Sequence, residues 1–160
     1  MGTDALIAEV RLATAADAAG LARLRYRWEG EHAGPAGEPP AEVLDGLGTA
    51  MAAWMRAHAE SHVCAVAVRG DAVVGMAWLA VTGRPPIPAD ADRRSGDVQS
   101  VFVLPELRSH GLGGRLLGAL HEVAAARGIT RITVHASSEA LAFYARLGYE
   151  PDPRLLAREA

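Results

Sequence analysis

The stretch Arg108–Arg115, which reads RSHGLGGR, stands between two segments with different apolar patterns. The apolar run from Val98 to Leu104 before it is typical of a strand. After it, apolar residues recur at helical spacing, at Leu112, Leu116, Leu117, Leu120, Val123 and Ala124. The stretch is therefore predicted to be a glycine-rich strand-to-helix turn. Such a turn presents backbone N–H groups at the positive end of a helix dipole, which predicts a phosphate site.

The overall composition limits the classes of protein to which the chain can belong. Its 160 residues suffice for a sizeable core, and we expect a single domain over residues 1–160. A net charge of −3 argues against a nucleic-acid-binding protein. The N-terminus does not resemble a signal peptide, and the longest nearly apolar run, Ala72–Val81, is too short to cross a membrane. We therefore expect a cytoplasmic protein that binds neither nucleic acid nor membrane. The single cysteine, Cys64, is expected to be a small buried hydrophobe.

Apolar periodicity and turn residues divide the rest of the chain into strands and helices. The predicted strands cover residues 7–12, 62–68, 72–81, 97–103 and 129–134. Helices are predicted after Thr14, from Ala41 to His58, after the glycine turn as far as Gly128, and from Ser137 or Ser138 to Gly148. Residues 29–40 and 83–96 are predicted loops, and residues 149–160 a tail with one or two brief strands. This order predicts a mixed α/β sheet.

Two motifs in a defined order carry a family resemblance. The turn lacks the Gly-Lys-Ser/Thr of a Walker A loop and the third glycine of a dinucleotide-binding fingerprint. It does match the pattern Arg/Gln-x-x-Gly-x-Gly/Ala through Arg108, Gly111 and Gly113, after a strand that ends VLPE. Residues 140–149, ALAFYARLGY, resemble the pattern Ala-x-x-x-Tyr-x-x-x-Gly-Phe, with Tyr149 in place of the phenylalanine. Between Val98 and Tyr149 the sequence thus resembles the GCN5-related N-acetyltransferases, the GNAT superfamily.

The resemblance implies a fold and a co-substrate. The fold is α/β (α+β), with a mixed, largely antiparallel sheet, a central splayed pair of parallel strands and about four flanking helices. The co-substrate is acetyl-CoA, bound by a core over about residues 97–149, and no metal is expected. Backbone groups of the strand pair with the pantetheine arm, and the glycine turn cradles the pyrophosphate. Ser137 stands where many relatives have an asparagine that contacts CoA. The predicted CoA-binding residues are Val101, Phe102, Val103, Arg108, Ser109, His110, Gly111, Leu112, Gly113, Gly114, Arg115 and Ser137.

The resemblance also implies candidates for proton transfer. Tyr144 stands where many relatives have the tyrosine that protonates the leaving thiolate, although a packing tyrosine has the same pattern. Asp97 matches the strand position at which the histone-acetylating members have a glutamate, and it could equally be a solvated aspartate. Gln99 shares the strand face of Asp97 and can contact the substrate. The sequence does not rank the other candidate bases, which are Glu29, Glu31, His32, His58 and His135.

Together these observations predict an acetyl-CoA-dependent N-acetyltransferase. The amine is expected to attack directly in a ternary complex, with a small metabolite or antibiotic amine as acceptor. A protein lysine or N-terminal acetyltransferase, a non-catalytic acyl-CoA-binding regulatory module and an α/β domain with no CoA site are the alternatives. The acceptor pocket is expected from residues 28–40, the second helix and residues 83–96, and acidic residues between Glu29 and Glu42 suit a cationic substrate. Dimers are common in the family, so a homodimer is compatible with the resemblance.

Overall fold

The computed structural model describes residues 8–33 and 39–158, and the side chains of residues 32 and 33 are not described. Its sheet has five strands in the order β1-β2-β3-β4-β5. The β4–β5 pair is parallel and every other pair is antiparallel. This arrangement confirms the predicted mixed, largely antiparallel sheet. The strands are β1 (Glu9–Leu12), β2 (His62–Arg69), β3 (Ala72–Gly83), β4 (Arg94–Val103) and β5 (Ile132–Val134).

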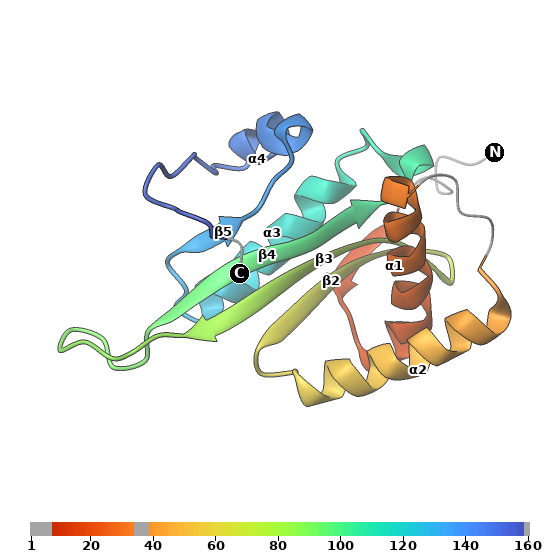
Figure 1. The fold of residues 1–160 in the computed structure, drawn as a ribbon, viewed down its shortest axis with the longest axis horizontal. Helices are drawn as coiled ribbons and strands as arrows, with labels where there is room; N and C mark the ends of the chain where they lie inside the picture. The colour runs from red at the N-terminus through yellow and green to blue at the C-terminus, as the bar shows by residue number, and fades with distance from the viewer. Residues whose placement is uncertain (1–7, 34–38, 159–160) are drawn as a thin grey trace.

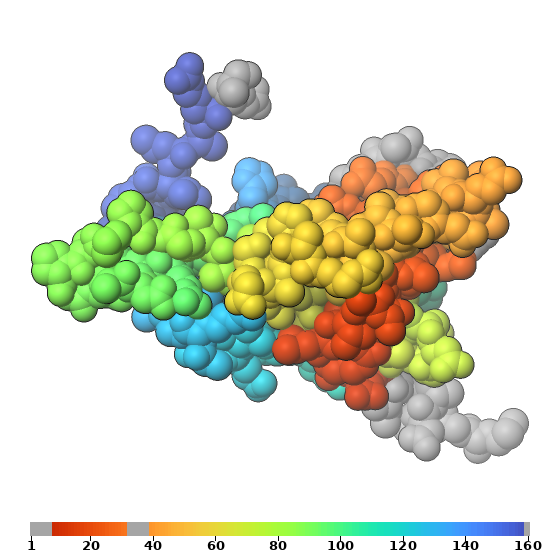
Figure 2. Space-filling view, turned by 90° about the horizontal axis from the view of Figure 1, so that it is seen from below, coloured from red at the N-terminus to blue at the C-terminus, as the bar shows by residue number. Residues whose placement is uncertain are grey.

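Helices cover both faces of this sheet (Figure 1). Leu21 and Leu24 of α1 pack with Cys64, Met76 and Trp78 on one face. On the other face, the buried leucines of α3 pack with the small and branched residues of β2 and β3. Figure 2 shows α2 and α3 on opposite sides of the molecule, with the β3–β4 hairpin projecting at one end. The helices are α1 (Ala18–Ala33), α2 (Ala41–Ala57), α3 (Leu112–Ala126) and α4 (Leu141–Arg146).

The start of α1 is fixed by a buried carboxylate. Asp17 is 8% exposed and ends a short 3₁₀ turn, Ala15–Asp17, that leads into the helix. It accepts two 2.8 Å hydrogen bonds from the guanidinium of Arg11 and one of 2.8 Å from the backbone N–H of Thr14. The Arg11 guanidinium holds the pKa of Asp17 below its usual range. Strand β1 and helix α1 are thereby tied together.

Strands β4 and β5 separate soon after they meet. Their pairing is confined to Gly96–Val98 against Ile132–Val134. A bulge follows in β4, where the register against β3 shifts between Met76 and Trp78, and Ser100 adopts a positive φ of 50°. The bulge increases the local twist of β4. Beyond it, β4 continues to Val103 with no partner strand on its β5 side among the described residues. The predicted splay of the parallel pair is therefore present.

Several boundaries differ from those predicted. Helix α1 continues to Ala33, into the predicted loop at 29–40. The predicted loop at 83–96 is largely a hairpin, because β3 continues to Gly83 and β4 begins at Arg94. The first predicted strand began at Ile7, which lies outside the described residues, and β5 is shorter than predicted. None of the described helices is long and apolar enough to span a membrane.

The described part of the tail, residues 149–158, contains no strand, so the one or two predicted there are absent. Strand β5 consequently has an open outer edge. The N–H of Gly96 donates to the carbonyl of Arg131, and alternation along a parallel ladder then directs the backbone groups of Ile132 and Val134 away from β4. Proline cannot donate to a ladder, which explains why Pro151 and Pro153 do not form a further strand.

Candidate functional site

The glycine turn forms a concave set of N–H donors at the start of α3. Gly111 is the N-cap, with φ 77° and ψ 2°, and Ser109 also has a positive φ of 66°. The first helical hydrogen bond is donated by the N–H of Arg115 to the carbonyl of Gly111, at 3.1 Å. The N–H groups of Leu112, Gly113 and Gly114 therefore precede the helical ladder and remain available to an anion.

A cavity of about 750 Å³ opens from this turn. Its walls are Val101 and Val103 of β4, the turn itself, and one side of α4, including Phe143 and Tyr144. Gly113 lies where α3 and α4 approach closely, because a Cβ there would lie 3.1 Å from the ring of Phe143, which would have to shift slightly. We refer to this space as the donor cavity.

Neither predicted arginine points to the donors of the turn. Arg108 forms an ion pair with Glu31 of α1 at 2.9 Å, and its Nε donates to the carbonyl of Val103 at 3.0 Å. Arg115 donates to the carbonyl of Ala8 at 2.9 Å. The role of the two arginines as CoA-binding residues thus stays a prediction, whereas the backbone donors are positioned without them.

Of the other predicted CoA-binding residues, some face the donor cavity and some do not. The N–H of Leu104 bonds to the carbonyl of Val74 in β3, so alternation directs the backbone groups of Val101 and Val103 toward the splay. Phe102 has its side chain buried on the opposite face, among the residues that pack with α1. His110 is exposed, with Nδ1 2.7 Å from the carbonyl of Arg108. Ser137 is the exposed N-cap of a 3₁₀ turn, Ser138–Ala140, and lies outside the donor cavity lining.

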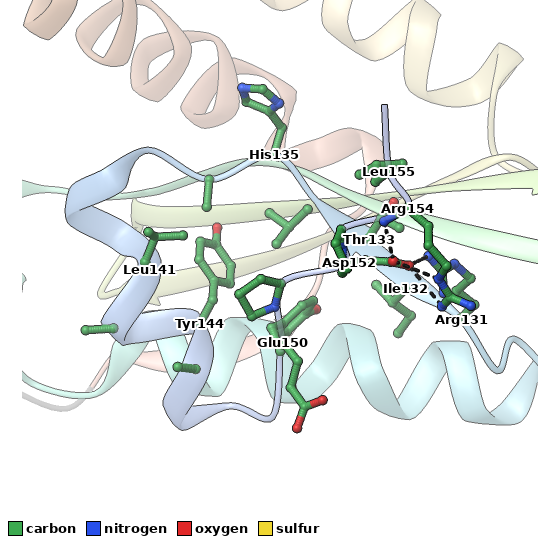
Figure 3. A pocket seen from close by; sticks show the side chains of 17 residues that line it. Arg131, Ile132, Thr133, His135, Leu141, Tyr144, Glu150, Asp152, Arg154 and Leu155 are labelled. Atoms are coloured by element: carbon green, nitrogen blue, oxygen red, sulfur yellow. Dashed lines mark hydrogen bonds and ion pairs between the residues drawn. The ribbon is translucent and has the colours of Figure 1, made fainter. Parts of the chain in front are cut away.

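Tyr144 lies at the end of the donor cavity that is nearest to β5. Its side chain is 8% exposed, and burial raises the pKa of its hydroxyl. The ring packs edge-on against Tyr149, which in turn shares a 2.8 Å hydrogen bond with Nε2 of His121. Figure 3 shows the Tyr144 hydroxyl pointing from α4 toward the end of β5 that carries His135. Tyr144 is therefore a rigid, protonated phenol at the mouth of the splay.

Asp97 lies in the paired part of β4, opposite Thr133 of β5. Its two carboxylate oxygens accept hydrogen bonds from the hydroxyl of Thr133, at 3.0 Å, and from the amide of Gln99, at 3.1 Å. It does not line the donor cavity. The structure thus brings together Asp97 and Gln99, as the shared strand face predicted.

The other candidate bases are dispersed. Glu29 and Glu31 are held by Arg25 and Arg108. His58 stacks on Trp54, at a centroid distance of 4.3 Å. His135 follows β5, and the side chain of His32 is not described.

Comparison with known proteins identifies the family to which a chain with this sheet and this glycine turn belongs. The acetyltransferase (GNAT) family model matches residues 24–149. The chain belongs to this family.

A curated relative and several solved structures agree. The chain is 30% identical over 105 residues to YhfO, an uncharacterised N-acetyltransferase of Bacillus subtilis (strain 168), covering 62% of this chain and 68% of that protein. An acetyltransferase of Trypanosoma brucei superposes with a TM-score of 0.74 at 22% identity, over 96% of this chain and 100% of its own. A predicted acetyltransferase of Clostridium acetobutylicum, solved with acetyl-CoA, gives 0.74 at 19% identity, over 96% of both chains.

As a GNAT enzyme, the protein is an N-acetyltransferase that uses acetyl-CoA as its acetyl donor. The donor cavity fits this co-substrate. It offers backbone donors for a pyrophosphate, a glycine where α4 lies close to α3, and a strand edge without a partner strand for an extended arm. Within the described ranges, no group of three His, Cys, Asp or Glu residues is arranged to hold a metal ion.

A second cleft of this GNAT protein lies on the other face of the sheet. It has a volume of about 430 Å³ and is built by α1, α2 and strands β2 to β4. The second helix and Gln99, which were both expected to face the acceptor, line this cleft, whereas the predicted loop at 83–96 does not. The contributions of α1, β2 and β3 were not predicted, because these residues are far apart in the chain and belong to no motif. We refer to this second cleft as the acceptor cleft. Its lining is Arg25, Leu47, Ala50, Met51, Trp54, His62, Trp78, Gln99 and Ser100.

A third cavity, of about 870 Å³, lies between β5, α4 and the tail (Figure 3). Asp152 of the tail is paired there with Arg131 and Arg154, and these two arginines hold the pKa of Asp152 far below its usual range. Tyr144 borders both this cavity and the donor cavity.

Proposed function

We propose that the protein transfers the acetyl group to a small primary amine by direct attack in a ternary complex. One observation carries this proposal: the two clefts reach the bulge of β4 from opposite faces of the sheet. Val101 lines the donor cavity, and its neighbours Gln99 and Ser100 line the acceptor cleft. Donor and acceptor can therefore be bound together, with the splay between them.

A different mechanism would first transfer the acetyl group to a cysteine of the enzyme. The single cysteine of this chain does not support that mechanism. Cys64 is 4% exposed within β2, and burial raises the pKa of its thiol. A buried thiol with a raised pKa is a poor nucleophile.

When bound, acetyl-CoA supplies an acetyl thioester, whose C–S bond breaks as the C–N bond to the amine forms. The protein's share is to position both partners and to move protons. Val101 would hold the extended arm through its backbone groups, and the N–H groups of residues 112–114 would hold the pyrophosphate. Tyr144 would give its proton to the leaving sulfur, because its raised pKa keeps the phenol protonated through the neutral range.

The resemblance implies Asp97 as a base that acts through a water molecule, and a single substitution decides between Asp97 and a base elsewhere in the acceptor cleft. Asp97→Asn preserves the size of the side chain and removes its ability to accept a proton. If Asp97 is the base, kcat/KM should fall and its pH–rate profile should change shape. A profile identical to that of the wild type would remove Asp97 from the mechanism.

The experiment that tests the function is an acceptor screen with thiol detection. Release of free CoA with a small amine supports the proposal. Turnover confined to a protein lysine or N-terminus would favour a protein acetyltransferase. Acetyl-CoA that raises the melting temperature without any thiol release would favour a regulatory binding module. Size-exclusion chromatography with light scattering tests the homodimer that the family resemblance allows.

A further inference from the structure

The acceptor cleft has apolar, aromatic walls. Trp54 of α2 and Trp78 of β3 meet edge-to-face at a centroid distance of 5.7 Å. Leu47, Ala50 and Met51 complete the wall that α2 contributes. Its volume of about 430 Å³ suits one small molecule. Trp54 is 38% exposed, so part of this aromatic surface faces the opening of the cleft. These walls favour a ligand with a flat apolar body.

The charged group in the lining of the cleft is a guanidinium, whose partner Glu29 lies outside the lining. Among the described residues that line it, none is an aspartate or glutamate, and Arg25 is the permanently charged side chain. Arg25 hydrogen-bonds the hydroxyl of Ser100 and lies 3.5 Å from Glu29, so part of its five-donor fork remains for a ligand. A guanidinium in an aromatic cleft disfavours polycations and suits a carboxylate. The cationic substrate predicted from the acidic residues between Glu29 and Glu42 stays a prediction, because part of that segment lies outside the described residues.

His62 is the titratable group at the other end of the cleft. It is the first residue of β2, and its ring meets Trp54 edge-on at 4.7 Å. Its Nδ1 lies 3.0 Å from the hydroxyl of Ser61, which leaves Nε2 as the other site for a proton. Burial, and then the neighbouring His58, lower the pKa of His62, so it is neutral at pH 7 and can accept a proton.

The groups that surround His62 are consistent with this role. His58 at the end of α2 and Arg25 of α1 are the titratable or charged side chains that the two helices place near it. On the sheet, the register places Asp97 in the same cross-strand row, with Ala80 between them. Two strand spacings separate Asp97 from His62, about 10 Å.

We propose that the acceptor cleft binds a primary amine that has a flat apolar body and a carboxylate, with Arg25 holding the carboxylate and His62 accepting the ammonium proton. This inference rests on the proposed function and specifies its substrate class. An aromatic α-amino acid is the simplest member of that class.

The protons balance as follows. The ammonium group gives one proton to Nε2 of His62, which releases it to solvent. The neutral amine forms the C–N bond as the C–S bond of the thioester breaks. Tyr144 protonates the thiolate, and the second proton lost by the new amide nitrogen restores Tyr144. The products are the N-acetyl amine, CoA and one proton.

Four monoamines and one polyamine, each tested as an acceptor, show which features of the cleft determine its choice of substrate. Phenylalanine carries both the ring and the carboxylate, phenethylamine lacks the carboxylate, and alanine lacks the ring. Spermidine is the polycation, and 4-aminobenzoate has a ring, a carboxylate and an amine that is already neutral at pH 7. We expect kcat/KM for phenylalanine to exceed that for phenethylamine by about tenfold or more, the worth of one charge-assisted hydrogen bond.

Two variants assign these effects to residues. Arg25→Gln should remove the preference for phenylalanine over phenethylamine, so that the two values of kcat/KM differ by less than about threefold. Arg27→Gln is the matched control, an exposed arginine of the same helix that does not line the cleft, and should leave the preference intact. His62→Gln should lower kcat for phenylalanine by about 100-fold and spare 4-aminobenzoate, whose amine needs no base.

The outcomes are distinguishable. Faster turnover of spermidine than of phenylalanine, or an unchanged preference in Arg25→Gln, would overturn the inference and leave the proposed function standing. An equal loss with both ring substrates in His62→Gln would overturn the role of His62. If no amine is acetylated, the proposed function fails. Titration of the protein's tryptophan fluorescence with phenylalanine then tests separately whether the cleft binds this ligand. A saturable change that disappears in Arg25→Gln, which keeps all three tryptophans, at unaltered melting temperature, supports the site, and no change overturns it.

Discussion

The donor cavity and the acceptor cleft differ in how they are encoded. The donor cavity depends on backbone N–H groups within a single turn, Arg108–Arg115, and on one strand and one helix beside it. The acceptor cleft depends on side chains between residues 25 and 100, brought together by two helices and three strands. A phosphate site made of backbone groups is therefore local, and a sequence motif can predict it. A pocket made of side chains from distant segments forms only when the chain folds, and no motif predicts it. The comparison also predicts that the two sites respond differently to substitution.

The largest effect is expected at Tyr144, where the donor cavity meets the splay. Tyr144→Phe removes the proton donor and preserves the buried ring, so kcat should fall by about 100-fold. Acetyl-CoA affinity and melting temperature should change little, because the ring contacts with Phe143 and Tyr149 persist. Steady-state kinetics and calorimetric titration check this prediction. An unchanged kcat would make Tyr144 a packing residue.

The next effect concerns the stability that α1, one wall of the acceptor cleft, gains from its link to β1. Asp17→Asn weakens the link to Arg11 and should lower the free energy of unfolding by about 2 kcal/mol at pH 7. The folded-state pKa of Asp17 is depressed, so its stabilisation is complete above the unfolded-state pKa of about 3.9 and is lost as pH falls through the folded value. Urea denaturation should therefore show the difference between wild type and variant shrinking below about pH 4. A difference that is constant with pH would exclude this linkage.

A matched pair of glycines tests the claim that the donor site is made of backbone. Gly111 and Gly70 both have positive φ, 77° and 61°, and an added Cβ would meet nothing within 4 Å at either position. Valine at each should therefore impose a similar backbone strain. Only Gly111→Val should weaken acetyl-CoA binding, by about tenfold, because only that turn carries the N–H donors. Equal losses of affinity in both variants would mean that general destabilisation is responsible.

The smallest effect concerns the ion pair between Arg108 and Glu31, which joins the two sides. Arg108 follows the strand that lines the donor cavity, and Glu31 belongs to α1, which helps to form the acceptor cleft. Glu31→Gln should release Arg108 toward the pyrophosphate and change acetyl-CoA affinity by no more than about fivefold, as expected for an exposed pair. Isothermal titration at low and high salt measures this. A weaker affinity in the variant would show that the pair supports the turn.

Sequence patterns predicted the layout of the sheet and the donor side. The glycine spacing and the apolar run before it are local, so the turn at Gly111 and the start of α3 were found where expected. Predicted loops were too long because charged and small residues also form the ends of α1 and of the β3–β4 hairpin. The bulge at Ser100 has no glycine to mark it.

The side-chain partners could not be predicted, since they depend on long-range contacts. Arg108 meets Glu31 and Arg115 meets the carbonyl of Ala8 only in the folded chain. His62 is a single histidine at a strand start, with no neighbouring residue pattern that separates it from a structural one. What could have drawn attention to it is the spacing of Trp54, His58 and His62, which places three rings near one helix end.

The open edge of β5 has a consequence for the behaviour of the protein in concentrated solution. An unpaired strand edge is a template on which another chain can add a strand and begin an aggregate. Here the edge is only Ile132–Val134, and it faces a tail that carries Pro151, Pro153 and the charged group of Asp152 with its arginines. Short length, proline and charge are the devices by which natural sheets avoid growing from one molecule to the next. The tail adds no strand to the sheet, and its prolines and charges disfavour the pairing of β5 with a strand of another molecule.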